Sequence, residues 1–401
     1  MNKLIFQVLK KDKCSNARLG VLTTLHGIVK TPAYVIVATR GEIKTLKPSD
    51  IKKTKTQIVI SNTYHLWPEA IKIKNLEKQS FITERLLEIK LPTMTDSGGF
   101  QVFSLAFGRH DKAGKIFPQT TETQKKTEKA KRRNIRITDK GVYFKSGNKW
   151  RFLGPELSIK IQEKLGADII FAFDECTSFF DDFKYNRKAM ERTHKWALTS
   201  LKVKIKNEKL RKRGKQQMLF GIVQGGRYKQ LRVQSAKFIG SLPFDGFGIG
   251  GSFGKEEMAE MLRWIIPNLP EEKPRHLLGI GRIEDIFRAV ENGVDLFDCV
   301  IPTREARHGR IWTAKNHYYI RKLKFSKDKE PLEKGCKCPA CKTTTRAEIH
   351  KLFKNPKKLT RGQRLTTIHN VYFFNDFVEK IRDSIARGKF IEFKNKILNN
   401  L

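Results

Sequence analysis

The feature that most constrains the fold is a repeat of short apolar runs, most of which end in Gly, Asp or Asn. Eight such runs lie at 33–39, 57–62, 91–96, 167–174, 218–225, 246–251, 276–281 and 294–300. Amphipathic stretches typical of helices separate most of them, at 155–165, 184–204, 228–240, 255–266 and 284–292. Strands that alternate with helices predict an α/β fold with a parallel sheet. Eight strands favour a closed (β/α)8 TIM-type barrel, with a doubly wound open sheet as the alternative because periodicity alone does not show closure.

Three segments break this repeat, and the rest of the chain predicts a catalytic barrel at 33–330. Residues 1–32 alternate weakly around a glycine turn, which predicts a small β-rich segment. Residues 108–148 are polar and basic and indicate an exposed insertion, partly disordered or a loose hairpin. We expect this insertion to be a solvated surface, with contact to nucleic acid as the alternative. Residues 331–401 predict a zinc-binding subdomain and C-terminal helices, the latter at 344–353 and 375–387.

The charge of the chain indicates a polyanionic partner. Lys and Arg number 81 against 41 Asp and Glu, which gives a formal net charge of +40. A surplus of this size suits nucleic acid, because each phosphate contact releases counterions. A general bias of the proteome toward lysine is the alternative, since net charge bears on partners and not on fold.

The distribution of apolar residues and cysteines favours a cytoplasmic protein. No apolar run approaches the roughly 18 residues that a membrane span needs, and the N-terminus becomes charged too soon for a signal peptide. Three of the six cysteines are clustered and three are scattered. This pattern differs from a secreted disulfide framework and fits a reducing compartment.

The clustered cysteines are the strongest local signal. Cys336, Cys338 and Cys341 lie in Cys-Lys-Cys-Pro-Ala-Cys, and three thiolates this close suit half of a zinc shell. A histidine would complete a tetrahedral Cys3His site, which is structural because it leaves no position for substrate. We favour His369, expected at the start of a helix that turns back to the loop, over His350. One structural Zn²⁺ is therefore predicted.

Polar residues at several strand ends predict a second site. Asp96 and Phe100 lie in Asp-Ser-Gly-Gly-Phe-Gln, Asp174 ends Phe-Ala-Phe-Asp, and Gln224 lies in Gly-Ile-Val-Gln-Gly. Carboxyl ends of barrel strands form the active face, so these groups should meet there with Asp298. Carboxylates and an amide pair with ring N–H, amino and carbonyl groups, while an aromatic ring stacks on a plane. The set suits a flat polar heterocycle such as guanine.

The stretch 295–312 places cations beside two acids. Asp295 and Asp298 lie in an apolar run that Pro302 ends, and a basic loop is expected after it, with Arg304, Arg307, His308 and Arg310. A carboxylate next to cations suits a negatively charged substrate held over a nucleophile or base. An ordinary strand end with a solvated loop is the alternative.

These motifs together resemble one family. Asp96-Ser-Gly-Gly-Phe-Gln, Phe-Asp174-Glu-Cys-Thr, Gly-Ile-Val-Gln224-Gly, Phe-Asp298-Cys-Val-Ile-Pro-Thr-Arg304 and the Cys-x-Cys-x2-Cys…His cluster occur in this order. The chain resembles the bacterial-type tRNA-guanine transglycosylases (queuine tRNA-ribosyltransferases) over roughly 20–390, and from this resemblance we expect it to lack the additional C-terminal RNA-binding domains of archaeal relatives. The motif set as a whole is highly specific.

The resemblance implies a pentosyltransferase of queuosine tRNA modification. Such enzymes exchange guanine at wobble position 34 of GUN-anticodon tRNAs (Asp, Asn, His and Tyr) for a 7-deazaguanine by double displacement. It implies Asp298 as the nucleophile that forms a covalent aspartyl–tRNA intermediate, and Asp96 as the general acid/base. It also implies base binding by Ser97, Phe100, Asp174, Cys176, Gln224, Gly250, Gly251 and Leu278, and phosphate binding by Arg304, Arg307 and Arg310. A homodimer is a further expectation from the resemblance.

The chain departs from the family pattern in the pocket loop and near the cysteines. The loop reads Gly251-Ser-Phe253-Gly254, and glycine stands where enzymes that use preQ1 (7-aminomethyl-7-deazaguanine) tend to carry valine. A roomier pocket could admit queuine, but Phe253 could fill that room, so preQ1 is favoured and queuine stays open. The spacing from Cys341 to His369 is two residues longer than usual, which an insertion at 355–358 would absorb.

Two other functions compete with the transferase. A non-catalytic RNA-binding partner subunit is disfavoured because Asp96, Asp298 and all three clustered cysteines are present. A nucleosidase acting on a free nucleoside is disfavoured because a small neutral substrate needs neither the high charge nor the arginines after Asp298.

Overall fold

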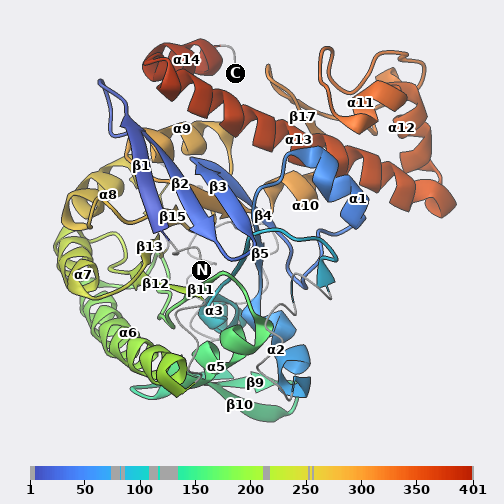
Figure 1. Ribbon diagram of the computed structural model, residues 1–401. Helices are drawn as coiled ribbons and strands as arrows, with labels where there is room; N and C mark the ends of the chain where they lie inside the picture. The colour runs from blue at the N-terminus through green and yellow to red at the C-terminus, as the bar shows by residue number, and fades with distance from the viewer. Residues whose placement is uncertain are drawn as a thin grey trace.

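The computed structural model describes residues 5–73, 82, 86–107, 116–117, 134–210, 217–251, 253–254 and 257–399. Its centre is a closed barrel of parallel strands in the order β11-β12-β13-β15-β16-β4-β5-β6 (Figure 1). The strands are β4 (Ala33–Val37), β5 (Val59–Ser61), β6 (Thr93–Thr95), β11 (Ile169–Phe171), β12 (Met218–Val223), β13 (Gly246–Ile249), β15 (Arg275–Leu277) and β16 (Leu296–Cys299). Seven of the predicted runs contain one strand each, and the run 276–281 overlaps β15, which begins one residue earlier, so the closed barrel is confirmed and the open sheet is wrong.

Helices surround the barrel and bury one face against it. They include α2 (Thr63–Lys72), α5 (Pro155–Leu165), α6 (Phe183–Leu210), α7 (Lys229–Ser241), α8 (Met258–Ile265) and α9 (Ile283–Glu291). In α9, Ile283, Ile286, Phe287 and Val290 are buried, which is the spacing of an apolar helix stripe. Inside the barrel, Phe171, Phe220, Met94 and Leu296 belong to a separate buried cluster, so the barrel interior is packed with side chains.

An antiparallel sheet of β1 (Ile5–Lys11), β2 (Arg18–Thr24) and β3 (Gly27–Thr31) lies over one end of the barrel (Figure 1). Leu22 and Val29 from this sheet join the interior cluster. Arg18 donates to both carboxylate oxygens of Asp295, at 2.8 and 2.6 Å, and Asp295 directly precedes β16. The sheet therefore covers the amino-terminal ends of the barrel strands and leaves their carboxyl ends for a site.

Part of the segment 108–148 is an ordered sheet with one buried face, and not a disordered or loose insertion. Strands β8 (Ile135–Thr138), β9 (Gly141–Ser146) and β10 (Lys149–Leu153) pair antiparallel. Phe144 is fully buried, and its ring lies 5.8 Å from Tyr64 and 6.5 Å from Trp67 of α2. The expectation is wrong here because alternating apolar residues within a basic stretch pack against the helix layer. Residues 108–115 and 118–133 lie outside the described residues.

Past β16 the chain forms α10 (Ile301–Arg307), β17 (Arg310–Trp312), β18 (His317–Tyr319), α11 (Pro339–Thr343), α12 (Arg346–Lys354), α13 (Leu359–Ala386) and α14 (Phe390–Leu398). The basic loop expected after Pro302 is wrong, because a proline in the first turn favours helix and starts α10.

The long helix α13 runs along the barrel (Figure 1), where Phe374 meets Tyr34 at a ring distance of 5.3 Å. It begins well before 375. The interval 355–358 holds the short 3-10 helix η6 (Pro356–Lys358).

No helix among the described ranges has the length and apolar character needed to cross a membrane.

Candidate active site and metal cluster

A pocket of about 520 Å³ opens at the carboxyl ends of the barrel strands. Nine of the residues predicted for the site line it: Asp96, Ser97, Phe100, Asp174, Cys176, Gln224, Leu278, Asp298 and Arg304. Gly250 and Gly251 lie just behind this lining, since a Cβ on Gly250 would come within 2.6 Å of Gln224 Nε2. The volume suits a small planar ligand, and the lining combines carboxylates with apolar walls.

Asp298 is held by two groups from the neighbouring strand β15 and the turn after it. Its Oδ1 lies 2.9 Å from His276 Nε2 and accepts a bond of 3.3 Å from the Gly279 N–H. His276 is fully buried, while 16 % of the Asp298 side chain is exposed to the pocket. A carboxylate is acceptor-only, so the ring donates from Nε2. These contacts fix the carboxylate at the pocket surface.

Asp96 follows β6 and accepts hydrogen bonds from the start of α2. Asn62 Nδ2 donates at 2.6 Å, and the backbone N–H groups of Thr63 and Gly98 donate at 3.0 Å. Asn62 also caps α2 by accepting from the His65 N–H. Two donors at the amino terminus of α2 and one from the turn that follows Asp96 hold this carboxyl group in place.

Asp174, Ser97 and Gln224 form a buried polar group on the other side of the pocket. Asp174 accepts from Ser97 Oγ at 3.1 Å and from Gln224 Nε2 at 2.7 Å. Gln224 Oε1 is buried and has no hydrogen-bond partner among the described residues. A buried acceptor without a protein partner is costly, so the group favours a ligand that supplies donors.

Arg232 of α7 supports this part of the pocket from behind and was missed by the sequence analysis. It is fully buried, and it donates to the carbonyls of Gly226 and Gly250, each at 2.7 Å. Burial lowers the pKa of Arg232 to about 10, so the guanidinium stays charged at neutral pH. A Cβ on Gly251 would lie 2.6 Å from Arg232 Nη2, and its φ of +100° also requires glycine.

The three arginines predicted to bind RNA have different surroundings. Arg304 of α10 lines the pocket. Burial, followed by the nearby charge of Arg304, lowers the pKa of Arg307. Arg310 forms an ion pair with Glu305 at 3.2 Å and lies over the rings of Trp312 and Tyr319. Arg304 therefore lines the same pocket as Asp298, whereas Arg310 is engaged with aromatic and acidic neighbours.

Three residues that no local sequence motif indicated also contact the residues of the pocket. His276 contacts Asp298, Asn62 contacts Asp96, and Arg232 holds two glycine turns. The sequence signal for Asn62 is its place at a strand end of the repeat, whereas His276 lies within β15 and has no such signal. Arg232 has no such signal, because a basic residue in an amphipathic helix usually faces solvent.

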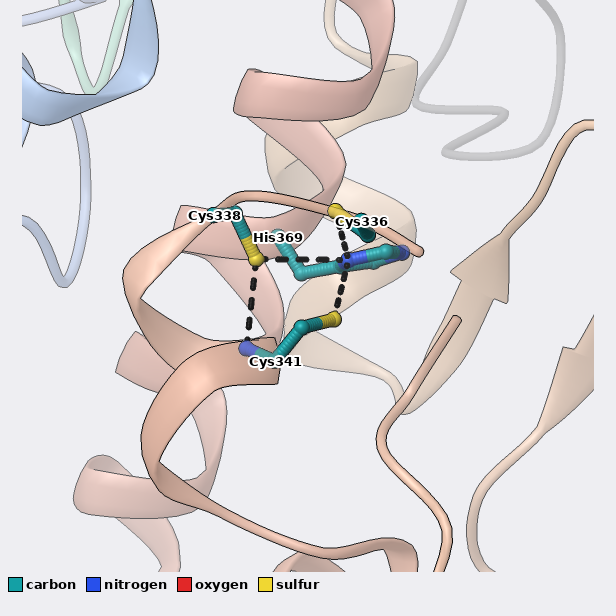
Figure 2. A group of neighbouring side chains, drawn as sticks. All are labelled: Cys336, Cys338, Cys341 and His369. Atoms are coloured by element: carbon teal, nitrogen blue, oxygen red, sulfur yellow. Dashed lines mark hydrogen bonds between the residues drawn. The ribbon is translucent and has the colours of Figure 1, made fainter. Parts of the chain in front are cut away.

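The predicted cysteine cluster comes together with His369. One donor atom from each of Cys336, Cys338, Cys341 and His369 lies within 4.8 Å of the others. His369 Nδ1 lies 3.7, 3.6 and 3.3 Å from the three sulfurs (Figure 2). Tetrahedral zinc with ordinary Zn–S and Zn–N bonds requires an S···N separation of about 3.5 Å, so the donor set fits a metal.

The second ring nitrogen of His369 explains its orientation. Nε2 lies 2.8 Å from the carbonyl oxygen of Trp312, and this contact leaves Nδ1 to face the sulfurs. His350 is outside the cluster, with its Nδ1 at 2.8 Å from the Ile320 carbonyl. His369 lies in the middle of α13, so its expected place at a helix start is wrong, although its place in the cluster is confirmed.

A closed barrel with carboxylates gathered at the carboxyl ends of its strands, and a Cys3His cluster beside it, defines a barrel enzyme with a separate metal site. The sequence profile of the queuine tRNA-ribosyltransferase family matches residues 12–401. The chain belongs to this family of tRNA-guanine transglycosylases, which are pentosyltransferases.

Individual relatives agree over nearly their whole length. The putative queuine tRNA-ribosyltransferase of Archaeoglobus fulgidus is 41% identical, over 97% of this chain and 98% of the relative. The queuine tRNA-ribosyltransferase of Halothermothrix orenii is 39% identical over 98% of this chain and 96% of its own. That of Enterococcus faecalis is 38% identical over 97% and 94%. The resemblance drawn from the motifs is thereby confirmed.

Proposed function

We propose that this chain exchanges guanine at the wobble position of GUN-anticodon tRNAs for a 7-deazaguanine, by double displacement through an aspartyl–RNA intermediate. The observation that supports it most is the convergence of Asp96, Asp174 and Asp298 on one pocket. Family membership supports a tRNA and a guanine-type base as substrates.

In the first displacement, a carboxylate oxygen of Asp298 attacks C1′ of the ribose and the bond from C1′ to guanine breaks. Asp96, in its acid form, gives its proton to the leaving guanine. In the second, Asp96 takes a proton from the incoming base, whose nitrogen attacks C1′ and releases Asp298. A covalent intermediate divides one difficult displacement into two steps with lower activation barriers. The target base must also leave its stacked position in the RNA to enter the pocket.

Base recognition falls to the group around Asp174. Its carboxylate would accept from the N–H and amino group of the base, Gln224 Oε1 would accept from a further donor of the base, and the backbone at Gly251, next to Gly250, would meet the carbonyl edge. Phe100, which is 39 % exposed, would stack on the ring. Cys176, Leu278 and Ser97 would form the walls.

The phosphates on either side of the reacting nucleotide would meet the arginines after Asp298. Arg304 lies on the pocket lining, which supports a direct contact. Arg307 and Arg310 follow within six residues of Arg304 in the sequence, and the net charge of +40 supports a polyanionic substrate.

One structural Zn²⁺ would be held by Cys336, Cys338, Cys341 and His369. When bound, the ion supplies cross-linking and no chemistry, because four protein donors close its shell. Cys336, Cys338 and Cys341 lie in or next to α11, and His369 lies in α13. The site would fasten this loop to the helix that packs on the barrel.

We propose preQ1 as the incoming base. The backbone of β7 (Ile116–Phe117) pairs with β14 (Phe253–Gly254), and the register joins Gly254 to Phe117. Paired strands lie about 4.8 Å apart, so the main chain at Phe117 takes up the space beside Gly254. This supports the smaller base in spite of the glycine.

Release of radiolabelled guanine from a GUN-anticodon tRNA tests the function. We expect release with preQ1 and none with queuine. Replacement of 108–133 by a short Gly-Ser linker removes β7, and we expect the variant to accept queuine while it keeps preQ1. Release by queuine from the unaltered chain would overturn the preQ1 assignment, and release by neither base would favour a non-catalytic partner subunit.

A further inference from the structure

The sheet β8-β9-β10 presents alternating basic and aromatic side chains on one face. In register, Arg136 pairs with Tyr143, which pairs with Phe152, and Lys145 pairs with Trp150. Because cross-strand partners point to the same side, these five residues form one surface, here called the outer face. Tyr143 is 41 % exposed and Trp150 is 51 % exposed.

The rings and cations of the outer face lie close together. The ring centroids of Tyr143 and Phe152 are 4.8 Å apart, and Lys145 Nζ lies 5.7 Å from the centroid of the Trp150 ring. The opposite face carries Val142, Phe144 and Leu153, which are fully buried. The sheet is therefore anchored by its inner face, and the outer aromatic rings are not needed to fill a core.

Charge distinguishes this sheet from an ordinary surface. Residues 134–154 contain five Lys or Arg residues and a single acid, Asp139. That acid is engaged with Lys195 of α6 at 2.9 Å. Cations interleaved with exposed rings are the features by which proteins hold unpaired nucleotides, with phosphates on the cations and bases on the rings.

The place of the sheet in the barrel links it to the pocket. It is inserted between β6, which Asp96 follows, and α5, so both its ends connect at the carboxyl ends of the barrel strands. In Figure 1, β9 and β10 lie at the edge of the barrel beside α5 and α2. A polymer that enters the pocket can extend over this edge, whereas a free base cannot.

We propose that the outer face of β8-β9-β10 is a second RNA contact, which binds unpaired nucleotides of the same RNA whose reacting nucleotide enters the pocket. Trp150 and Tyr143 stack on bases, while Lys145 and Arg136 contact phosphates. The inference rests on the proposed RNA substrate, but it concerns affinity for the RNA and not the exchange of bases.

Binding of the substrate tRNA, followed by fluorescence anisotropy with the full-length chain, tests the proposal. We expect Trp150→Ala and Lys145→Glu each to raise Kd by roughly tenfold, and Trp150→Phe, which keeps a stacking ring, to raise it much less. Lys30→Glu makes the same charge change on exposed β3, over the other end of the barrel, and should leave Kd near that of the unaltered chain.

The rate of guanine exchange separates this proposal from the proposed function. At saturating tRNA, Trp150→Ala should exchange guanine at the unaltered rate, with its loss confined to KM. If the unaltered chain exchanges guanine but Trp150→Ala and Lys145→Glu bind tRNA as it does, the outer face is not an RNA contact. If the unaltered chain binds tRNA but does not exchange guanine, the proposed function is wrong. The Kd values of Trp150→Ala and Lys145→Glu would then still show whether the outer face contacts RNA. A change in oligomeric state at unchanged Kd would assign the face to protein contact and overturn the proposal.

Discussion

Asp298→Asn is expected to abolish the covalent RNA adduct and to lower guanine exchange by about 10⁴-fold or more. An amide keeps the shape of the side chain and can still accept from Gly279 N–H and His276 Nε2, but it cannot serve as the attacking anion. The melting temperature should therefore stay close to that of the unaltered chain. Denaturing gels of labelled RNA with the protein measure the adduct, and guanine release measures the exchange.

Asp295→Asn is the matched contrast, three residues earlier in the same stretch. Asp295 is fully buried, and Arg18 donates to both of its oxygens. Loss of its charge leaves a buried guanidinium without its counter-ion, which should cost about 3–5 kcal/mol of unfolding free energy. Folded Asp295→Asn protein should still form the adduct. An adduct that persists in Asp298→Asn would move the nucleophile elsewhere, with Asp96 as the next candidate.

The barrel was predictable because its signal is local and repeated. Each strand needs a short apolar run with a polar or glycine end, and the sequence carries eight of them. The helix after Pro302 was missed although proline in a first turn is a local helix signal, whereas the early start of α13 was not predicted because contacts with distant segments hold it. Thr366 Oγ1, for instance, donates to the Ala306 carbonyl of α10.

The site divides in the same way. Residues that act from strand ends, such as Asp96 and Asp298, stand out in sequence because the topology places all such ends together. Arg232 and His276 act through other residues over sequence separations of 18 and 22. Their roles depend on which strands and helices become neighbours, and a single sequence carries little trace of that. The sheet β8-β9-β10 was misjudged because its charge obscured its alternation.

Removal of the metal is expected to unfold the C-terminal part of the chain and to lower the melting temperature strongly. Metal binding to a Cys3His set contributes folding free energy directly, because the unfolded chain has no preformed site. Cys338 is fully buried, so Cys338→Ser should lose the ion. The variant should also lose several kcal/mol of unfolding free energy, because metal binding contributes to folding. Metal content per chain and thermal melting with and without chelator measure both effects.

The two histidines provide the sharpest control for this prediction. His369→Ala should lose the ion, because Nδ1 lies within 3.7 Å of all three sulfurs, whereas His350→Ala should keep one zinc per chain. Cys14→Ala, at an exposed thiol far from the cluster in sequence, should change neither metal content nor melting. The destabilisation should reach the barrel, since α13 carries both His369 and Phe374, which packs on Tyr34 of β4. A melting temperature that is unchanged after verified loss of zinc would show that packing alone holds α13 and that the ion has no structural role.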